Sequence, residues 1–165
     1  NNVYGIRACV LRLTNTYGPG MRVKDARQTF LGIWVRLLLE GKPIKVFGDG
    51  EQLRDFNYVD DCVTALLLAG ESEQANGKVY NLGSEEVIGL KALAEMMTNL
   101  GYGGSYELVP FPEERKAIDI GDYYSDFSLI SKDLGWSPQI SLKQGLLKTI
   151  EYYSKHRSAY WDEAQ

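Results

Sequence analysis

The sequence predicts an α/β domain, because segments with the period of a helix alternate with short apolar runs that suit buried strands. Glycine and proline clusters separate these segments, as they do at turns. With 165 residues, 44% of them hydrophobic and 24% charged, the chain can bury the core of one domain. We therefore expect a single domain over 1–165, whose polar tail at 157–165 frays.

The first predicted strand is the apolar run 8–13. It is followed by 14–20, which is predicted to be a loop because it contains glycine and proline. A helix comes next, because large apolar residues recur at helical spacing, and the Gly-Lys-Pro segment 41–43 ends it. The residues that carry this spacing are Phe30, Trp34, Leu37 and Leu38.

The middle of the chain continues the alternation of strand and helix. Short strands are expected at 44–47 and 55–59, and a Gly-Asp-Gly turn follows the first of them. A helix is expected over 60–70, since two acidic residues at its start suit the positive end of the helix dipole. The apolar run 78–82 predicts another strand.

The C-terminal part predicts two helices around an extended segment. Apolar residues at helical spacing indicate an amphipathic helix over 90–100, and 106–109 looks extended. Ser141 and Gln144 have the spacing of a capping box, so we expect the last helix to begin directly after Ser141 and to run through Tyr153.

Charge and cysteine content exclude several classes of partner. The net charge of −4 gives no basic field that would hold nucleic acid or an anionic membrane surface. No apolar run approaches the ~20 residues that a transmembrane helix needs, and no signal-peptide pattern is present. Cys9 and Cys62 stand in apolar stretches, which favours buried, reduced thiols, a cytoplasmic location and no metal site.

The sequence offers no convincing catalytic centre. None of its glycine clusters has the G-x-G-x-x-G spacing of a dinucleotide fold. No tyrosine has a lysine four residues later, the pair in which lysine lowers the pKa of the phenol so that tyrosine can act as a base. The only histidine, His156, lies near the C-terminus, which argues against a Ser-His-Asp or Cys-His arrangement. We expect no catalytic residue in this chain.

Three segments, taken together, resemble the extended short-chain dehydrogenase/reductase family of NAD-dependent nucleotide-sugar epimerases and dehydratases. They are Arg-Leu-Thr-Asn-Thr-Tyr-Gly-Pro-Gly at 12–20, the stretch 41–61 that contains Phe-Gly-Asp-Gly and Arg-Asp-Phe-Asn-Tyr-Val-Asp-Asp, and 115–138, which ends in Leu-Gly-Trp-Ser-Pro. Asn-Leu-Gly at 81–83 also matches. The resemblance implies an α/β fold that is the C-terminal, substrate-binding lobe with residual strands of the Rossmann sheet, and that lacks the N-terminal GxxGxxG half.

The resemblance also implies roles for residues near the first two segments. Asn15 would bind the substrate diphosphate, and Leu13 and Thr16 would lie near the nicotinamide of NAD, consistent with ligands gathering at the carboxyl ends of strands. Phe47 would lie beside the nucleotide base, where an aromatic face can stack without selecting the base. From the residues alone, Asn15 could equally shape a turn and Phe47 could belong to the core.

Two arginines match those that hold the diphosphate in the family. Arg54 and Arg115 suit this role because a guanidinium binds phosphate oxygens through two donors and stays charged. Surface ion pairs with neighbouring carboxylates remain the alternative for both. Asp119 matches an acidic position that contacts the ribose hydroxyls, although Asp122 competes with it because the segment is longer than in many members.

The function implied is the nucleotide-sugar-binding portion of an NAD-dependent epimerase of the UDP-glucose 4-epimerase kind, inactive alone. Portions of a 4,6-dehydratase or decarboxylase, or a non-catalytic nucleotide-diphosphate-binding module, are the alternatives. NAD is the cofactor of the intact family enzyme, and we expect this chain alone to bind none. The expected partners are a nucleotide-diphosphate sugar, most simply a UDP-sugar, together with either a second copy of the chain or the missing Rossmann half.

Overall fold

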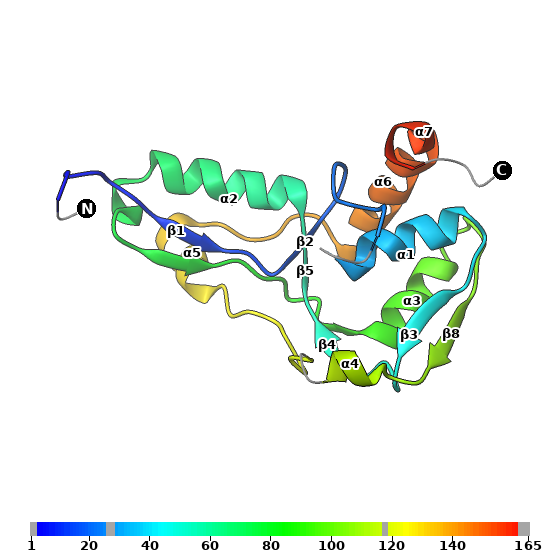
Figure 1. Cartoon of the computed structure of the whole chain (residues 1–165). Helices are drawn as coiled ribbons and strands as arrows, with labels where there is room; N and C mark the ends of the chain where they lie inside the picture. Colours follow the sequence, from blue (N-terminus) through cyan, green and yellow to red (C-terminus); the bar gives the residue numbers. More distant parts are fainter. Residues whose placement is uncertain (1–2, 26–28, 117–118, 162–165) are drawn as a thin grey trace.

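The protein is described by a computed structural model that covers residues 3–25, 29–116 and 119–161, apart from the side chain of Arg115. Figure 1 shows an elongated molecule with its described ends far apart. The strand pair β1 (Val10–Arg12) and β6 (Val79–Asn81) lies toward one end, and β3 (Ile44–Phe47) and β8 (Tyr106–Val109) lie toward the other. Both pairs are parallel, so the chain has the α/β fold that the sequence predicts.

The first end of the molecule is a two-stranded sheet covered on one face. Val10 of β1 lies opposite Val79 of β6, and the helices α2 (Val59–Glu71) and α5 (Ser128–Leu134) pack against Tyr80 and Leu82. The short helix η1 (Glu73–Ala75) lies between α2 and β6 in the chain. Another short helix, α4 (Glu113–Lys116), follows β8. Val10 and Val79, which point to the opposite face, are 51% and 42% exposed. One face of this sheet is therefore left uncovered by the described residues.

The segment predicted to be a loop, 14–20, contains a strand. Asn15–Tyr17 forms β2, which pairs in parallel with β5 (Phe56–Tyr58), and Thr16 lies opposite Asn57. The glycine and proline that indicated a loop lie only in the second half of the segment, and the first half is recruited by a partner strand that is remote in sequence. Ahead of β5, β4 (Leu53–Arg54) pairs antiparallel with β7 (Ile88–Gly89).

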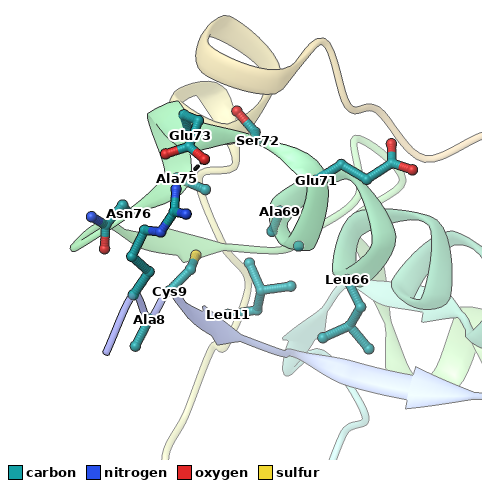
Figure 2. Close-up of a pocket in the computed structure, with 12 residues that line it drawn as sticks. Ala8, Cys9, Leu11, Leu66, Ala69, Glu71, Ser72, Glu73, Ala75 and Asn76 are labelled. Atoms are coloured by element: carbon teal, nitrogen blue, oxygen red, sulfur yellow. Dashed lines mark hydrogen bonds and ion pairs between the residues drawn. The ribbon is translucent and has the colours of Figure 1, made fainter. Parts of the chain in front are cut away.

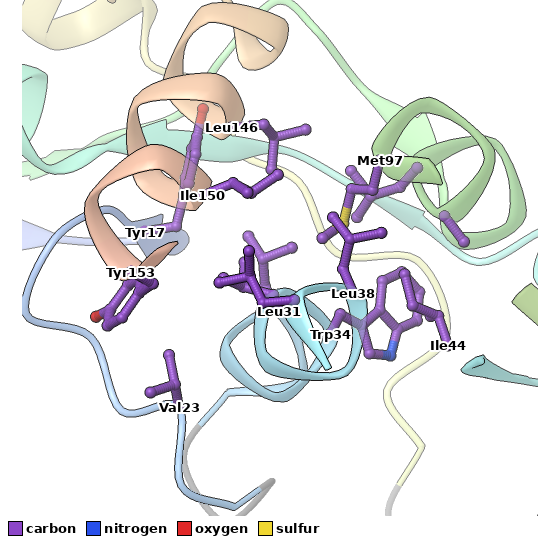
Figure 3. Close-up of a cluster of buried hydrophobic side chains, with 14 of the residues drawn as sticks. Tyr17, Val23, Leu31, Trp34, Leu38, Ile44, Met97, Leu146, Ile150 and Tyr153 are labelled. Carbon is purple, nitrogen blue, oxygen red and sulfur yellow. The ribbon is translucent and has the colours of Figure 1, made fainter. Parts of the chain in front are cut away.

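The second end of the molecule holds the larger core. The helices α1 (Phe30–Leu39) and α3 (Leu90–Thr98) pack against the β3–β8 pair, and α6 (Leu142–Lys155) packs against α1 and β5. Figure 3 shows Leu38 of α1 directed toward Met97 of α3, with Leu146 and Ile150 of α6 above them. All four side chains are fully buried, and burial of such a side chain contributes about 1.5–3 kcal/mol. This cluster fixes the three helices relative to β3.

The predicted capping box is present at the start of α6. The Ser141 hydroxyl accepts from the Gln144 N–H, and the Gln144 side chain accepts from the Ser141 N–H, both at 3.4 Å. Beyond α6 the chain differs from the expected frayed tail, because Arg157–Tyr160 forms α7 and Trp161 is only 6% exposed. The Arg36 guanidinium lies 5.7 Å from the centre of the Trp161 ring, so aromatic packing holds a segment whose polar composition suggested disorder. The last four residues of that expected tail, 162–165, lie outside the described part.

None of the helices in the described ranges is both long enough and apolar enough to cross a membrane.

Candidate functional site

Arg54 is a buried cation on β4. Its residue is only 8% exposed, and its Nη1 atom donates to the carbonyl oxygens of Leu53 at 2.7 Å and Gly121 at 2.5 Å. Within the described ranges, no carboxylate lies within 4.0 Å of its guanidinium, so the alternative of an ion pair with Asp55 is not what the structure shows. A buried guanidinium that contacts only neutral acceptors is an energetically costly arrangement, and it suits an anionic ligand.

Asn15 contacts the residue that follows Arg54 in the chain. Its side-chain amide donates to the backbone carbonyl of Asp55 at 2.9 Å, directly after Arg54 in the chain. The structure therefore brings two of the predicted binding residues together, with Asn15 reaching from β2 across to the junction of β4 and β5. The same contact shows that Asn15 also braces the backbone, as a residue that shapes local structure would.

The two residues expected near nicotinamide have different surroundings. Leu13 follows β1 and is 45% exposed. The Thr16 hydroxyl is half-buried and lies 3.4 Å from the Cys62 sulfur on α2. The Thr16 side chain is therefore in contact with a helix of this chain. Of the two residues, only Leu13 presents an exposed apolar side chain, after the carboxyl end of β1.

Phe47 lies at the end of β3 and outside both buried clusters, so it is not a core phenylalanine. Its ring packs against that of Phe111, with ring centres 5.7 Å apart and planes inclined by 53°. Phe111 precedes α4, the helix that carries Arg115. An aromatic pair excluded from the core forms an apolar platform of the kind on which a planar base can stack.

Residues 119–125, which we call the strap, run alongside β4. Tyr123 forms a parallel bridge with Arg54, and its N–H donates to the Leu53 carbonyl at 2.9 Å. The Asp122 carboxylate accepts from the Leu53 N–H at 2.8 Å, whereas the exposed Asp119 carboxylate accepts only a long contact from Gly121, at 3.4 Å. Asp122 is thus engaged in holding the strap, which leaves Asp119 as the better candidate for a ligand contact.

Arg115 lies on α4, just before the strap, but its side chain is not among the described ones. Its neighbour Glu113 forms an ion pair with Lys116, at 3.0 Å.

Sequence reasoning missed Asp55 as a member of this site. Its residue is 0% exposed, and its Oδ2 atom accepts from the N–H groups of Ser84 and Ser125, each at 3.2 Å. Burial raises the pKa of the Asp55 carboxyl above its ordinary value, while the Ser125 N–H, the Thr14 hydroxyl and the Ser84 N–H act in the opposite direction. A charged residue within the predicted strand 55–59 is the signal that could have found it.

A separate groove of about 430 Å³ lies at the other end of the molecule (Figure 2). It opens between β1 and α2, with Cys9 and Leu11 on one side and Leu66 and Ala69 on the other. Arg7 and Glu73 form an exposed ion pair at its rim. No part of the Arg54 site lines this groove.

No group of three or more His, Cys, Asp or Glu side chains in the described ranges is placed to hold a metal ion. The fold and the site define a class of protein: an α/β fold with parallel strand pairs and a buried arginine on β4. The family model described as the NAD dependent epimerase/dehydratase family matches residues 1–83, and the chain belongs to that family.

Curated relatives are similar to this chain over nearly all of its length. A dTDP-glucose 4,6-dehydratase from Streptomyces griseus is 30% identical over 96% of this chain and 46% of its own length. A UDP-glucuronic acid decarboxylase 1 from Xenopus tropicalis is 32% identical over 92% of this chain and 34% of its own length. The chain thus spans less than half the length of these relatives.

Solved structures have the same fold over the same part. A UDP-glucose 4-epimerase with UDP-glucose from Thermotoga maritima has a TM-score of 0.79 and 31% identity, over 94% of this chain and 48% of its own. A UDP-glucuronic acid 4-epimerase from Bacillus cereus, in complex with UDP-glucuronic acid and NAD, has a TM-score of 0.73 and 29% identity, over 94% and 48%. Members of the family therefore bind NAD and nucleotide sugars.

Proposed function

We propose that this chain is the nucleotide-sugar-binding part of an NAD-dependent nucleotide-sugar epimerase and that it holds the diphosphate of a UDP-sugar at Arg54. The observation that carries the proposal is the burial of the Arg54 guanidinium against two carbonyl oxygens, with no carboxylate partner among the described side chains. A diphosphate would supply the missing negative charge through charge-assisted hydrogen bonds. Asn15, Phe47, Arg115 and Asp119 are the further proposed contacts.

Calorimetric titration of the purified, folded chain with UDP, UDP-glucose and NAD tests the proposal. We expect UDP and UDP-glucose to bind and Arg54→Gln to weaken both at least about tenfold, as loss of one charged hydrogen-bonding group does. Arg22→Gln is the matched control, since Arg22 already pairs with Asp25 through two contacts of 2.9 and 2.7 Å. A wild-type chain that binds neither ligand, or an Arg54 variant that binds both as tightly as wild type, would contradict the proposal.

We propose that catalysis also needs a second half of the enzyme. The relatives contain this half, but this chain aligns only with the other one. The groove between β1 and α2 and the uncovered face at Val10 and Val79 are apolar surfaces that further strands and helices of a larger sheet would cover. Leu13 would there contact the nicotinamide of NAD. The sequence lacks a G-x-G-x-x-G segment, so we expect NAD to bind measurably only when that half is supplied.

A 4,6-dehydratase or decarboxylase is the second candidate, because curated relatives over the same part carry those activities. Adding the matching half and following UDP-glucose, dTDP-glucose and UDP-glucuronic acid by chromatography separates them. Epimerisation inverts one carbon of the sugar, dehydration removes water from it, and decarboxylation of the uronic acid releases carbon dioxide. A non-catalytic nucleotide-diphosphate-binding module would bind UDP and convert nothing in that assay. The free thiols Cys9 and Cys62 favour a reducing compartment such as the cytoplasm.

A further inference from the structure

We infer that Asp55 is a positioning residue for nucleotide binding, because its buried carboxylate fixes the strap that orients Arg54. The inference rests on the proposed function, since it assigns a role in the same site. Asp55 follows Arg54 in the chain, and its carboxylate accepts from two loops that come from distant parts of the sequence.

The contacts of Asp55 join three separate segments at one atom. Its Oδ2 accepts from Ser84, in the turn after β6, and from Ser125, the last residue of the strap. Asn57 supports the same turn, because its side-chain amide donates to the Gly83 carbonyl at 2.6 Å. A methyl group at Gly83 would lie 3.0 Å from the Asp55 Oδ2 and 2.7 Å from the Ser125 carbonyl oxygen, so the junction has no spare room.

The strap has little else to hold it. Ile120, Tyr123 and Tyr124 are 64%, 45% and 55% exposed, so apolar packing contributes little to its position. The polar contacts at Leu53 run along an exposed edge, whereas the contact between Ser125 and Asp55 is at a fully buried carboxylate. Asp122 and Asp55 both accept charge-assisted bonds, but a bond in the low-dielectric interior is electrostatically stronger than one at an exposed edge, so the Asp55 contact is the stronger anchor.

Arg54 depends on the strap in turn. One of the two carbonyl oxygens that its Nη1 contacts is that of Gly121, within the strap. If the end of the strap at Ser125 is released, only the contacts of Asp122 and Tyr123 with Leu53 still hold the strap near Gly121, and the contact that directs the guanidinium weakens. Asp119 lies in the same segment, so both proposed ligand contacts would shift together.

The test compares Asp55→Asn with Asp61→Asn in the full chain. Asp61 is the matched control because it is also a buried carboxylate, 4% exposed, that accepts from two backbone N–H groups, those of Gln139 and Ile140, at 3.1 Å each. Its contacts brace the segment before α6 and do not reach the strap. The readouts are the melting temperature, the UDP dissociation constant by calorimetry at 10 °C or below, and hydrogen exchange at the Tyr123 N–H.

We expect both variants to melt earlier than wild type. Only Asp55→Asn should weaken UDP binding, by about tenfold, and speed exchange at Tyr123, because weakening a charge-assisted bond releases the strap. Asp55→Glu, which restores the charge at a longer reach, should recover part of the affinity. Equal UDP affinity in the Asp55→Asn and Asp61→Asn variants, at equal loss of melting temperature, would overturn the inference.

Asp122→Ala provides a second variant that leaves the interior intact, since Asp122 is exposed and holds the strap from its other side. It should also speed exchange at Tyr123 and weaken UDP binding, and an unchanged result in both would overturn the inference. The two proposals fail differently. Loss of binding in Arg54→Gln with full binding in Asp55→Asn would overturn only the role of Asp55, whereas a wild-type chain that binds no UDP would overturn both.

Discussion

The hydroxyl of Tyr17 occupies the space that a side chain at position 145 would need. A methyl group at Gly145 would lie 2.1 Å from the Tyr17 Oη atom and 2.8 Å from its ring carbon Cζ. Tyr17 is 2% exposed and donates to the Leu142 carbonyl at 3.2 Å, so the ring cannot swing toward solvent without losing that bond. The absence of a side chain in the first turn of α6 is therefore what lets this helix approach β2.

Gly145→Ala should lower the free energy of unfolding by up to about 2 kcal/mol. Alanine gains about 1 kcal/mol in helix propensity, but overpacking a filled core costs about 1–3 kcal/mol and the contact with Tyr17 is with a fixed side chain. Urea unfolding followed by far-UV circular dichroism measures the change. The control is Gly70→Ala in α2, where nothing lies within 4 Å and the same substitution should stabilise. A Gly145 variant that gains stability as the Gly70 variant does would show that the helix can move away.

Trp136→Phe should destabilise the first end of the molecule without touching nucleotide binding. Trp136 is 2% exposed, and its indole N–H donates to the Asp61 carbonyl at 3.0 Å. Phenylalanine keeps much of the apolar area but loses this hydrogen bond, whose net contribution is about 0.5–1.5 kcal/mol. The expected result is a lower urea midpoint with an unchanged UDP dissociation constant. A change in UDP affinity larger than twofold would connect this cluster to the site.

Much of this fold could be predicted from local sequence. The apolar runs at 44–47 and 106–109, the helix over 90–100 and the capping box at Ser141 all depend on neighbours within a few residues, and each is present. Strand β2 could not be predicted in this way, because the partner that makes it a strand is β5, remote in the sequence.

The same reason explains which parts of the site were missed. Arg54 and Asn15 stand out by residue type, and the structure places them at one junction. The role of Asp55 depends on Ser84 and Ser125, which lie 29 and 70 residues away in the chain. A sequence shows that a carboxylate is present in a strand, but only the tertiary structure shows which N–H groups it accepts from.

The stability of the chain should contain a contribution from Asp55 that decreases as the pH rises. Burial raises the folded-state pKa of this carboxyl above the ordinary value of 3.8, so the folded state holds the proton more tightly than the unfolded state does. The contribution is fully present below pH 3.8 and is lost as the pH rises through the folded-state pKa. Urea unfolding of wild type and Asp55→Asn between pH 3 and 7 measures it: the stability of wild type relative to the variant should fall across that range. A difference that rises with pH would show that the hydrogen bonds outweigh the burial.

Gly83→Ala should weaken UDP binding, although Gly83 is not one of the proposed ligand contacts. The added methyl group would lie 2.7 Å from the Ser125 carbonyl oxygen. The backbone at Ser125 can make room for it only if the strap moves. Displacement of the strap changes the position of the Gly121 carbonyl that Arg54 contacts, so we expect a loss of affinity of about tenfold, comparable to that of Asp55→Asn. Calorimetry with UDP measures it, with Gly70→Ala as the control for an alanine in open space. Unchanged affinity would mean that the turn after β6 can absorb the methyl group without moving the strap.

A charged side chain on the exposed apolar face of α2 should cost this chain little stability. Val63, Leu66 and Leu67 are 46%, 55% and 65% exposed, which is unusual for three large apolar side chains on one helix. Leu67→Lys should change the free energy of unfolding by no more than about 0.5 kcal/mol, because its side chain has little packing to lose. The same substitution should reduce self-association in sedimentation velocity runs, since an exposed apolar face is what would pair. Leu93→Lys, on the fully buried face of α3, is the contrasting variant and should unfold the chain. If Leu67→Lys instead costs more than 1 kcal/mol at concentrations where the chain is monomeric, this face of α2 is covered within the chain itself.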